Sequence, residues 1–138
     1  MASALADTGA ILALLDRDDR WHRACVEEFK ALRLPLLTTA AILTELFHMV
    51  EDSAGEVAAA WRFVRSGALE VRTIDDSDLP ALESLMLKYR DRPMDFADAT
   101  LVQLARRERL STVFSVDRDF EIYRIDGRRR FRIVPEHA

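Results

Sequence analysis

Short apolar runs alternate along the chain with longer segments in which apolar residues recur every three or four positions. The short runs predict strands at residues 4–6, 36–38, 69–73, 112–116 and 131–134. The longer segments predict helices at about 10–15, 20–32, 39–50, 53–66, 75–89 and 94–109. Because helices separate the strands, we expect an α/β fold with a parallel sheet and right-handed crossovers.

Capping residues support several of these boundaries. Ser53 and Glu56 form a capping-box pattern, and Gly67 is a suitable C-cap for the helix that they begin. Pro35 marks the end of the helix at 20–32. Either Asp75 or Asp76 can cap the helix that follows the third strand.

Length and composition predict one globular domain spanning residues 1–138. The chain has 138 residues, of which 49% are hydrophobic and 32% charged, so it can bury a core and is not expected to be disordered. A single cysteine, Cys25, excludes an internal disulfide and a multi-thiolate metal site. No apolar stretch approaches the ~20 residues needed to cross a membrane, and the first residues lack a basic signal region. We therefore expect a cytoplasmic protein with no membrane partner.

Basic residues are unevenly distributed. The formal net charge is −4, which argues against non-specific adhesion to nucleic acid, yet 18 arginines accompany only two lysines. The arginines cluster at 106–109 and at 124–132. They could form a solvated surface, or they could hold phosphates beside an acidic site.

Acidic side chains follow two of the predicted strands and begin one of the predicted helices. Asp7 and Asp117 each come directly after a strand, and parallel strands place such positions at the same edge of the sheet. Asp95 and Asp98 lie three residues apart at a helix start, so both can project from one face. Glu45 lies beside an apolar helical stripe, where a plain surface glutamate is not expected.

Each of these acids also has a structural interpretation. Asp7 could be a turn residue or an N-cap, and Asp95 and Asp98 could cap a helix and favour its dipole. Glu45 could pair with an arginine, and Asp117 with Asp119 could cap a short turn.

Their convergence would have chemical consequences. Two carboxylates about 4 Å apart repel by roughly 4 kcal/mol at an effective dielectric near 20, so a cluster takes up protons or binds a cation. All-oxygen ligands favour a hard ion such as Mg²⁺ or Mn²⁺. Such an ion can recruit phosphate and activate water, which points to phosphodiester hydrolysis.

Four segments resemble the motifs of PIN-domain ribonucleases, in particular VapC-like toxins of type II toxin–antitoxin systems. They are residues 7–12, 38–45, 94–101 and 115–120, in the family's order and spacing. The resemblance covers about residues 4–135. It implies a PIN-like three-layer α/β/α fold with a central, mostly parallel sheet of about five strands.

The resemblance also implies site residues and partners. The catalytic set would be Asp7, Glu45, Asp98 and Asp117, with Asp7 and Asp98 as metal ligands. Asp95 and Asp119 would be accessory acids, and Asp119 could replace Asp117. The implied activity is a Mg²⁺- or Mn²⁺-dependent endoribonuclease that leaves a 5′-phosphate and a 3′-hydroxyl. RNA would be the substrate, a homodimer the usual state and an antitoxin protein the usual inhibitor, while no substrate-binding residue is identified.

Other functions remain open at this point. The chain could be a PIN-like RNA-processing nuclease without an antitoxin, or a non-catalytic RNA- or protein-binding module. Phosphotransfer domains of the haloacid-dehalogenase and receiver types also place an aspartate after a parallel strand. However, Asp7-Thr8-Gly9 lacks the second aspartate of the former, and only Lys30 and Lys88 could serve the latter.

Overall fold

The structure is a computed structural model, and it describes residues 2–92 and 94–136. Within these residues it contains five strands: β1 (Leu5–Ala6), β2 (Leu36–Thr38), β3 (Leu69–Val71), β4 (Thr112–Phe114) and β5 (Arg132–Val134). The same residues form six α-helices: α1 (Thr8–Leu15), α2 (His22–Ala31), α3 (Ala40–Val50), α4 (Ala54–Arg65), α5 (Leu79–Lys88) and α6 (Phe96–Glu108). Two 3₁₀ helices, η1 (Asp76–Asp78) and η2 (Arg118–Glu121), complete the described elements.

The strands form one sheet in the order β3-β2-β1-β4-β5, and each neighbouring pair is parallel. Leu5 lies opposite Leu37 on one side and opposite Val113 on the other. Ala6 pairs with Phe114, so the residues that follow, Asp7 and Ser115, are neighbours at the carboxyl edge. The predicted parallel sheet is confirmed.

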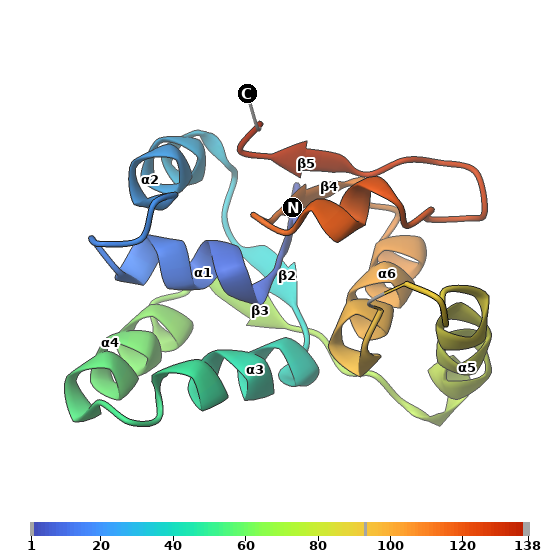
Figure 1. The fold of residues 1–138 in the computed structure, drawn as a ribbon, viewed down its shortest axis with the longest axis horizontal. Coiled ribbons are helices and arrows are strands. Elements are labelled where there is room, and N and C mark those ends of the chain that lie inside the picture. Colours follow the sequence, from blue (N-terminus) through green and yellow to red (C-terminus); the bar gives the residue numbers. More distant parts are fainter. Residues whose placement is uncertain (1, 93, 137–138) are drawn as a thin grey trace.

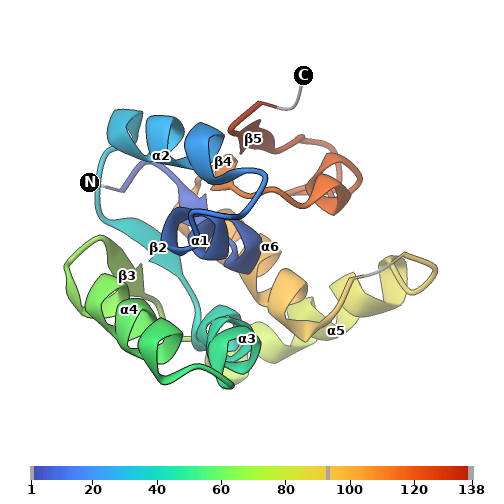
Figure 2. The same cartoon turned by 60° about the vertical axis from the view of Figure 1, so that its left-hand side comes forward.

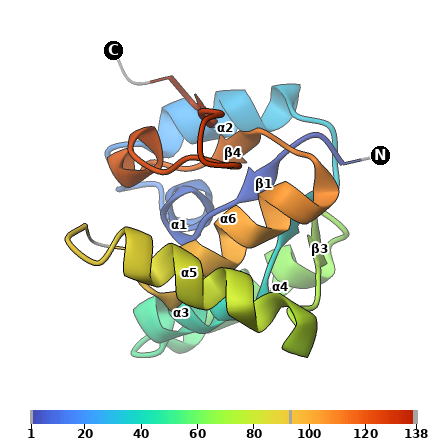
Figure 3. The ribbon, with the colours of Figure 1, turned by 90° about the vertical axis from the view of Figure 1, so that its right-hand side faces the viewer.

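Helices cover both faces of the sheet. Figure 1 shows the sheet running through the centre, and Figure 3 looks onto α5 and α6, with α2 and α4 behind the sheet. In Figure 2, α1 is seen nearly end-on between α2 and α3, and it contacts both of these helices. This α/β/α arrangement agrees with the predicted fold class.

The core forms between the sheet and these helices. Fully buried residues of β1, β2 and β4 include Leu5, Leu36 and Phe114, and α6 contributes a long buried run between Ala97 and Ala105. Burial on both faces explains why the strands appeared in the sequence as short continuous apolar runs rather than as alternating patterns.

The predicted helix at 75–89 is split in the structure. Asp75 caps η1, and α5 begins only at Leu79, followed by Pro80. Asp78 links this corner to α6, because its buried carboxylate accepts hydrogen bonds from Gln103 (2.9 Å) and Arg107 (2.9 Å). The first strand after this region, β4, ends at Phe114 rather than at residue 116 as predicted.

Candidate active site

Asp7 lies immediately after β1, at the N-cap position of α1. Its side chain makes no capping hydrogen bond there. Instead its Oδ2 accepts a hydrogen bond from Ser115 Oγ at 3.0 Å, and the residue is only 4% exposed. Its backbone N–H continues the sheet by donating to the carbonyl of Phe114 at 3.0 Å. The Asp7 carboxylate is therefore held at the carboxyl edge of the sheet by Ser115, the residue that directly follows the neighbouring strand β4.

Ser115 connects Asp7 to Asp117, two residues further along the chain. Its Oγ accepts a hydrogen bond from the backbone N–H of Asp117 at 2.9 Å while donating to Asp7. Asp117 in turn caps η2, because its Oδ1 accepts from the N–H of Asp119 at 2.9 Å. The turn-capping interpretation of Asp117 is correct, and it is compatible with a second role for the other carboxylate oxygen.

The start of α6 brings two more acids to this edge. Asp95 is the N-cap, and its Oδ1 accepts from the backbone N–H of Asp98 at 2.8 Å. Asp98 lies in the first turn and is 6% exposed. Its Oδ2 accepts a hydrogen bond from the hydroxyl of the fully buried Tyr123 at 2.9 Å. The positive end of the helix dipole favours an anion here by about 0.3–1 kcal/mol.

Glu45 reaches the same region from α3. Its Oε1 accepts a hydrogen bond from Thr8 Oγ1 at 2.9 Å, which ties α3 to the first residue of α1. Glu45 is half-buried, and the negative charges of Asp95 and Asp117 act on it. The glutamate beside the apolar stripe thus belongs to the acidic cluster, and no arginine among residues 2–92 and 94–136 pairs with it.

The protonation behaviour of these acids shows how close together they are. The pKa of Asp7 is raised to about 7. Burial is the main cause, and the negative charges of Asp117 and Glu45 contribute to the increase. Burial likewise raises the pKa of Asp98 to about 8, with contributions from Asp7 and Asp95. The pKa of Glu45 is raised by its partial burial and by Asp95. The predicted convergence of the strand-end and helix-start acids is therefore present in the fold.

Asp119 lies at the margin of the cluster. Partial burial and the charge of Asp117 raise its pKa. Asp117, by contrast, acts on the pKa values of Asp7, Glu45 and Asp98. Of the two candidates for the fourth acid, Asp117 is the one electrostatically linked to the other three.

The arginine cluster of α6 lies away from these acids. Arg106 and Arg107 are in the last turn of the helix, about 12 Å along its axis from Asp98 at 1.5 Å per residue. Arg106 donates to the carbonyl of Ile125, and Arg107 donates to the carbonyl of Thr73 and to Asp78. For these two residues the interpretation as a phosphate cradle beside the acids is wrong, since they make structural contacts elsewhere.

Sequence comparison assigns the chain to a family. Residues 4–126 match the PIN domain. The chain belongs to the PIN-domain family. It is 30% identical over 134 residues to Ribonuclease VapC26 of Mycobacterium tuberculosis, which covers 95% of this chain and 99% of that protein. The resemblance to VapC-like PIN domains is thereby confirmed.

Two solved structures share the fold of this PIN domain. The crystal structure of VapC20 of Mycobacterium tuberculosis, described as a sarcin-ricin loop cleaving toxin, has a TM-score of 0.78. It is 19% identical and covers 87% of this chain and 94% of its own. A toxin–antitoxin complex from Klebsiella pneumoniae has a TM-score of 0.64 at 17% identity, covering 84% of this chain and 88% of its own.

The acidic cluster of this PIN domain has the chemistry of a hard-cation site. In the part of the chain that the structure describes, no ion pair to lysine, arginine or histidine compensates Asp7, Glu45, Asp98 or Asp117. No three Asp, Glu, His or Cys side chains of residues 2–92 and 94–136 are already gathered as a complete ligand set. Mg²⁺ keeps several waters and needs one or two carboxylates, so the buried, all-oxygen donors fit such an ion.

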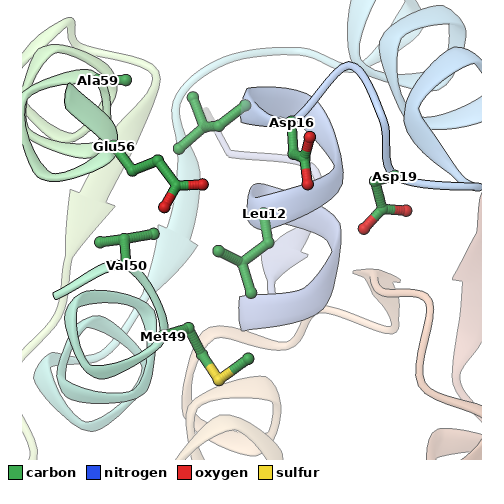
Figure 4. A pocket seen from close by; sticks show the side chains of 8 residues that line it. Leu12, Asp16, Asp19, Met49, Val50, Glu56 and Ala59 are labelled. Atoms are coloured by element: carbon green, nitrogen blue, oxygen red, sulfur yellow. The ribbon is translucent and has the colours of Figure 1, made fainter. Parts of the chain in front are cut away.

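A groove of about 220 Å³ lies between α1, α3 and α4 of the PIN domain (Figure 4). Its apolar lining includes Leu12, one helical turn after Thr8, and Met49, one turn after Glu45. Three carboxylates also line it: Asp16, Asp19 and Glu56. No ion pair to these three acids occurs among the described residues.

Two side chains that hold the acids were not found from the sequence. Thr8 donates a hydrogen bond to Glu45, 37 residues away in the sequence, and Tyr123 donates one to Asp98, 25 residues away. Tyr123 follows η2 in a segment where no periodicity marks it, so no sequence pattern indicated its partner. Ser115 lies in the segment 115–120 that resembles the fourth motif, but its hydrogen bond to Asp7 was not predicted.

Proposed function

We propose that this PIN domain, acting as one unit over residues 1–138, is a Mg²⁺- or Mn²⁺-dependent endoribonuclease and the toxin of a VapBC-type pair. The observation that supports this most directly is the buried group of uncompensated carboxylates at the carboxyl edge of the sheet. The relationship to Ribonuclease VapC26 supports the choice of RNA over other phosphodiesters.

In the proposed mechanism, Asp7 and Asp98 would hold the ion, directly or through water. Ser115 and Tyr123 fix one oxygen of each carboxylate, which leaves the other oxygen of each for the ion. A bound ion supplies Lewis-acid chemistry, neutralising charge on phosphate oxygens and making water more acidic. Glu45 and Asp117 accept hydrogen bonds from the attacking water and orient it toward phosphorus. Asp95 and Asp119 act as accessory acids through the charge that they add.

The substitution Asp98→Asn tests this assignment, because it keeps the side-chain shape and removes the charge. We expect Mn²⁺-dependent cleavage of single-stranded RNA to fall about 100-fold or more, since even the partners of metal ligands are worth 10–100-fold. Asp52→Asn, at an exposed aspartate between α3 and α4, is the matched control and should cleave normally. Undiminished cleavage by folded Asp98→Asn protein would reject the assignment.

An antitoxin is the protein partner in this proposal. The groove between α1, α3 and α4 has an apolar lining and uncompensated carboxylates, which suit a segment with apolar and basic side chains and disfavour RNA phosphates. The fold similarity to a toxin–antitoxin complex supports such a partner. Co-expression with the product of the adjacent reading frame, followed by copurification with and without Met49→Glu, tests both the partner and the groove.

The remaining parts of the proposal concern assembly and location. A homodimer is proposed from the relationship to VapC-like proteins, and sedimentation equilibrium measures it. In the described residues, no helix has the length and apolar character needed to span a membrane. The proposed place of action is the cytoplasm, where its RNA substrate is found.

A further inference from the structure

Basic side chains gather on two chain segments that lie near Asp98. The first segment, residues 88–92 at the end of α5, has three basic residues and one aspartate. The second, residues 124–132, leads from η2 into β5 and has five arginines and one aspartate. The two segments together, here called the basic flank, are strongly positive in a chain whose net charge is −4.

Hydrogen bonds and ring packing place the basic flank beside the acids. The hydroxyl of Tyr89 accepts a hydrogen bond from the backbone N–H of Arg124 at 2.9 Å, so the two segments meet. The rings of Tyr89 and Tyr123 pack edge-on at 5.2 Å, and Tyr123 donates to Asp98 at 2.9 Å. Arg92 precedes the N-cap of α6 by three residues, a span of at most about 11 Å. The flank therefore borders the acidic cluster on the α6 side.

The charges of the basic flank are not neutralised by carboxylates. Arg129 pairs with Asp126 inside the second segment. In the described part of the chain, no ion pair involves the other basic residues of the flank, which are Lys88, Arg90, Arg92, Arg124, Arg128, Arg130 and Arg132. Arg128 and Arg130 are exposed, and their side chains make no hydrogen bond within residues 2–92 and 94–136. These two guanidinium groups are free to bind an anion.

The second segment has a defined backbone that presents these arginines. Arg124 and Arg130 form an antiparallel bridge, and Gly127, with a φ of 83°, lies in the turn between them. Ile125 is fully buried, and its carbonyl accepts a hydrogen bond from Arg106 of α6. The backbone is thus anchored to α6 by groups other than the exposed arginine side chains, and substitutions at those side chains leave the anchor in place.

We propose that the basic flank binds the phosphates of a single RNA strand on either side of the acids; this rests on the ribonuclease function proposed above. A protein with net negative charge and uncompensated carboxylates at its site repels a polyanion, so a local positive surface is needed to hold one there. The planar guanidinium suits bidentate contacts with phosphate. Such contacts position the strand and carry no base preference.

The double substitution Arg128→Gln with Arg130→Gln tests the proposal. Binding of a fluorescein-labelled twelve-nucleotide single-stranded RNA is followed by anisotropy at several salt concentrations, in EDTA. Each lost phosphate contact makes the slope of log affinity against log salt less negative by about 0.7. Two lost contacts correspond to a change of about 1.4 and to about a 25-fold weaker Kd near 0.1 M salt. The loss should be the same for oligo(A) and oligo(U).

Arg62→Gln with Arg65→Gln is the matched control, because it removes the same charge from exposed arginines of α4. This helix lies on the opposite face of the sheet from α5 and α6 (Figure 3). The control should keep the salt slope and Kd of the unaltered protein. Equal changes in the two double variants would overturn the proposal, since overall charge alone would then explain them. An unchanged slope in the Arg128 and Arg130 variant would also overturn it.

The absence of cleavage in EDTA separates this inference from the proposed function. If the unaltered protein binds the RNA and the Arg128 and Arg130 variant loses affinity and slope, the inference stands even when no RNA is cleaved with Mn²⁺, and only the nuclease function is rejected. If RNA is cleaved with Mn²⁺ but the variant binds as tightly as the unaltered protein, the inference is rejected and the nuclease function stands. Failure of the unaltered protein to bind the RNA rejects the inference as well.

Discussion

Removing the hydroxyl of Tyr123 should weaken metal binding without disturbing the fold. Tyr123 is fully buried and donates to Asp98 Oδ2 at 2.9 Å. Burial and the neighbouring Asp98 raise the pKa of Tyr123, so its hydroxyl stays protonated and remains a donor. Tyr123→Phe keeps the ring, which packs edge-on against Tyr89 and Phe120 at centroid distances of 5.2 and 5.3 Å.

The magnitude follows from the bond that is lost. A hydrogen bond to a charged group is worth about 1.5–3 kcal/mol. Because each 1.4 kcal/mol is a factor of ten, the Kd for Mn²⁺ should rise about 10- to 150-fold. Tyr123→Phe destabilises the ionised form of Asp98 more than the protonated form. Because a bound cation requires the ionised carboxylate, the substitution weakens cation binding.

Isothermal titration of Mn²⁺ into the folded variant is the assay, and Tyr89→Phe is the control. Tyr89 belongs to the same aromatic cluster, but its hydroxyl accepts from the backbone N–H of Arg124 at 2.9 Å and does not touch Asp98. The Tyr89 variant should bind Mn²⁺ as the unaltered protein does. An equal Kd for both variants would refute the idea that Tyr123 orients a metal ligand.

Three further outcomes are expected. Because the folded-state pKa of Asp7 is about 7 and its ordinary value is 3.8, the stability that protonated Asp7 provides is lost as pH rises from about 4 to about 7. In urea titrations with EDTA, the free energy of unfolding should therefore fall by up to about 4 kcal/mol over that range. Mn²⁺ should reverse this loss, and Asp7→Asn should make the free energy of unfolding less dependent on pH. Asp78→Ala removes the buried carboxylate that links η1 to α6 and should cost about 3 kcal/mol in urea unfolding, while the folded fraction cleaves RNA normally. A Cβ at Gly9 would lie 2.8 Å from Val116 Cγ2, so Gly9→Ala should lose about 1–3 kcal/mol, and Gly9→Ala with Val116→Ala should recover part of it in the same assay.

The sequence predicted the sheet and the helices well because both faces of the sheet are buried. Strands such as Leu36–Thr38 lie in the core, so continuous apolar runs marked them. The ends of elements were less predictable, because they depend on local capping. Asp75 was identified as a helix start, but its capping box closes a 3₁₀ turn, and α5 follows only after it.

The convergence of the acids was predictable, whereas their supporting contacts were not. Asp7 and Asp117 follow neighbouring parallel strands, and this alone places them at one edge. The hydrogen bond from Tyr123 to Asp98 depends on how the segment after η2 folds back onto α6. The spacing of the two residues in the sequence does not predict that contact. The exposure of Phe96 was likewise not predicted. Its residue type was assigned only to the motif at residues 94–101, and its exposure depends on how neighbouring elements pack.

The topology explains why carboxylates from both sides of the sheet meet at one point. The strand order β3-β2-β1-β4-β5 reverses direction at β1, so the connections through α1 to α4 and through α5 and α6 cover opposite faces. Next to this reversal, Asp7 and Asp117 follow β1 and β4 at the carboxyl edge of the sheet, the part of such sheets where ligands bind. Glu45 reaches this edge from one face and Asp98 from the other, each on a helix packed against the other helix. Moving either acid by one helical position would turn it away by about 100°, so the cluster depends on the register of both helices.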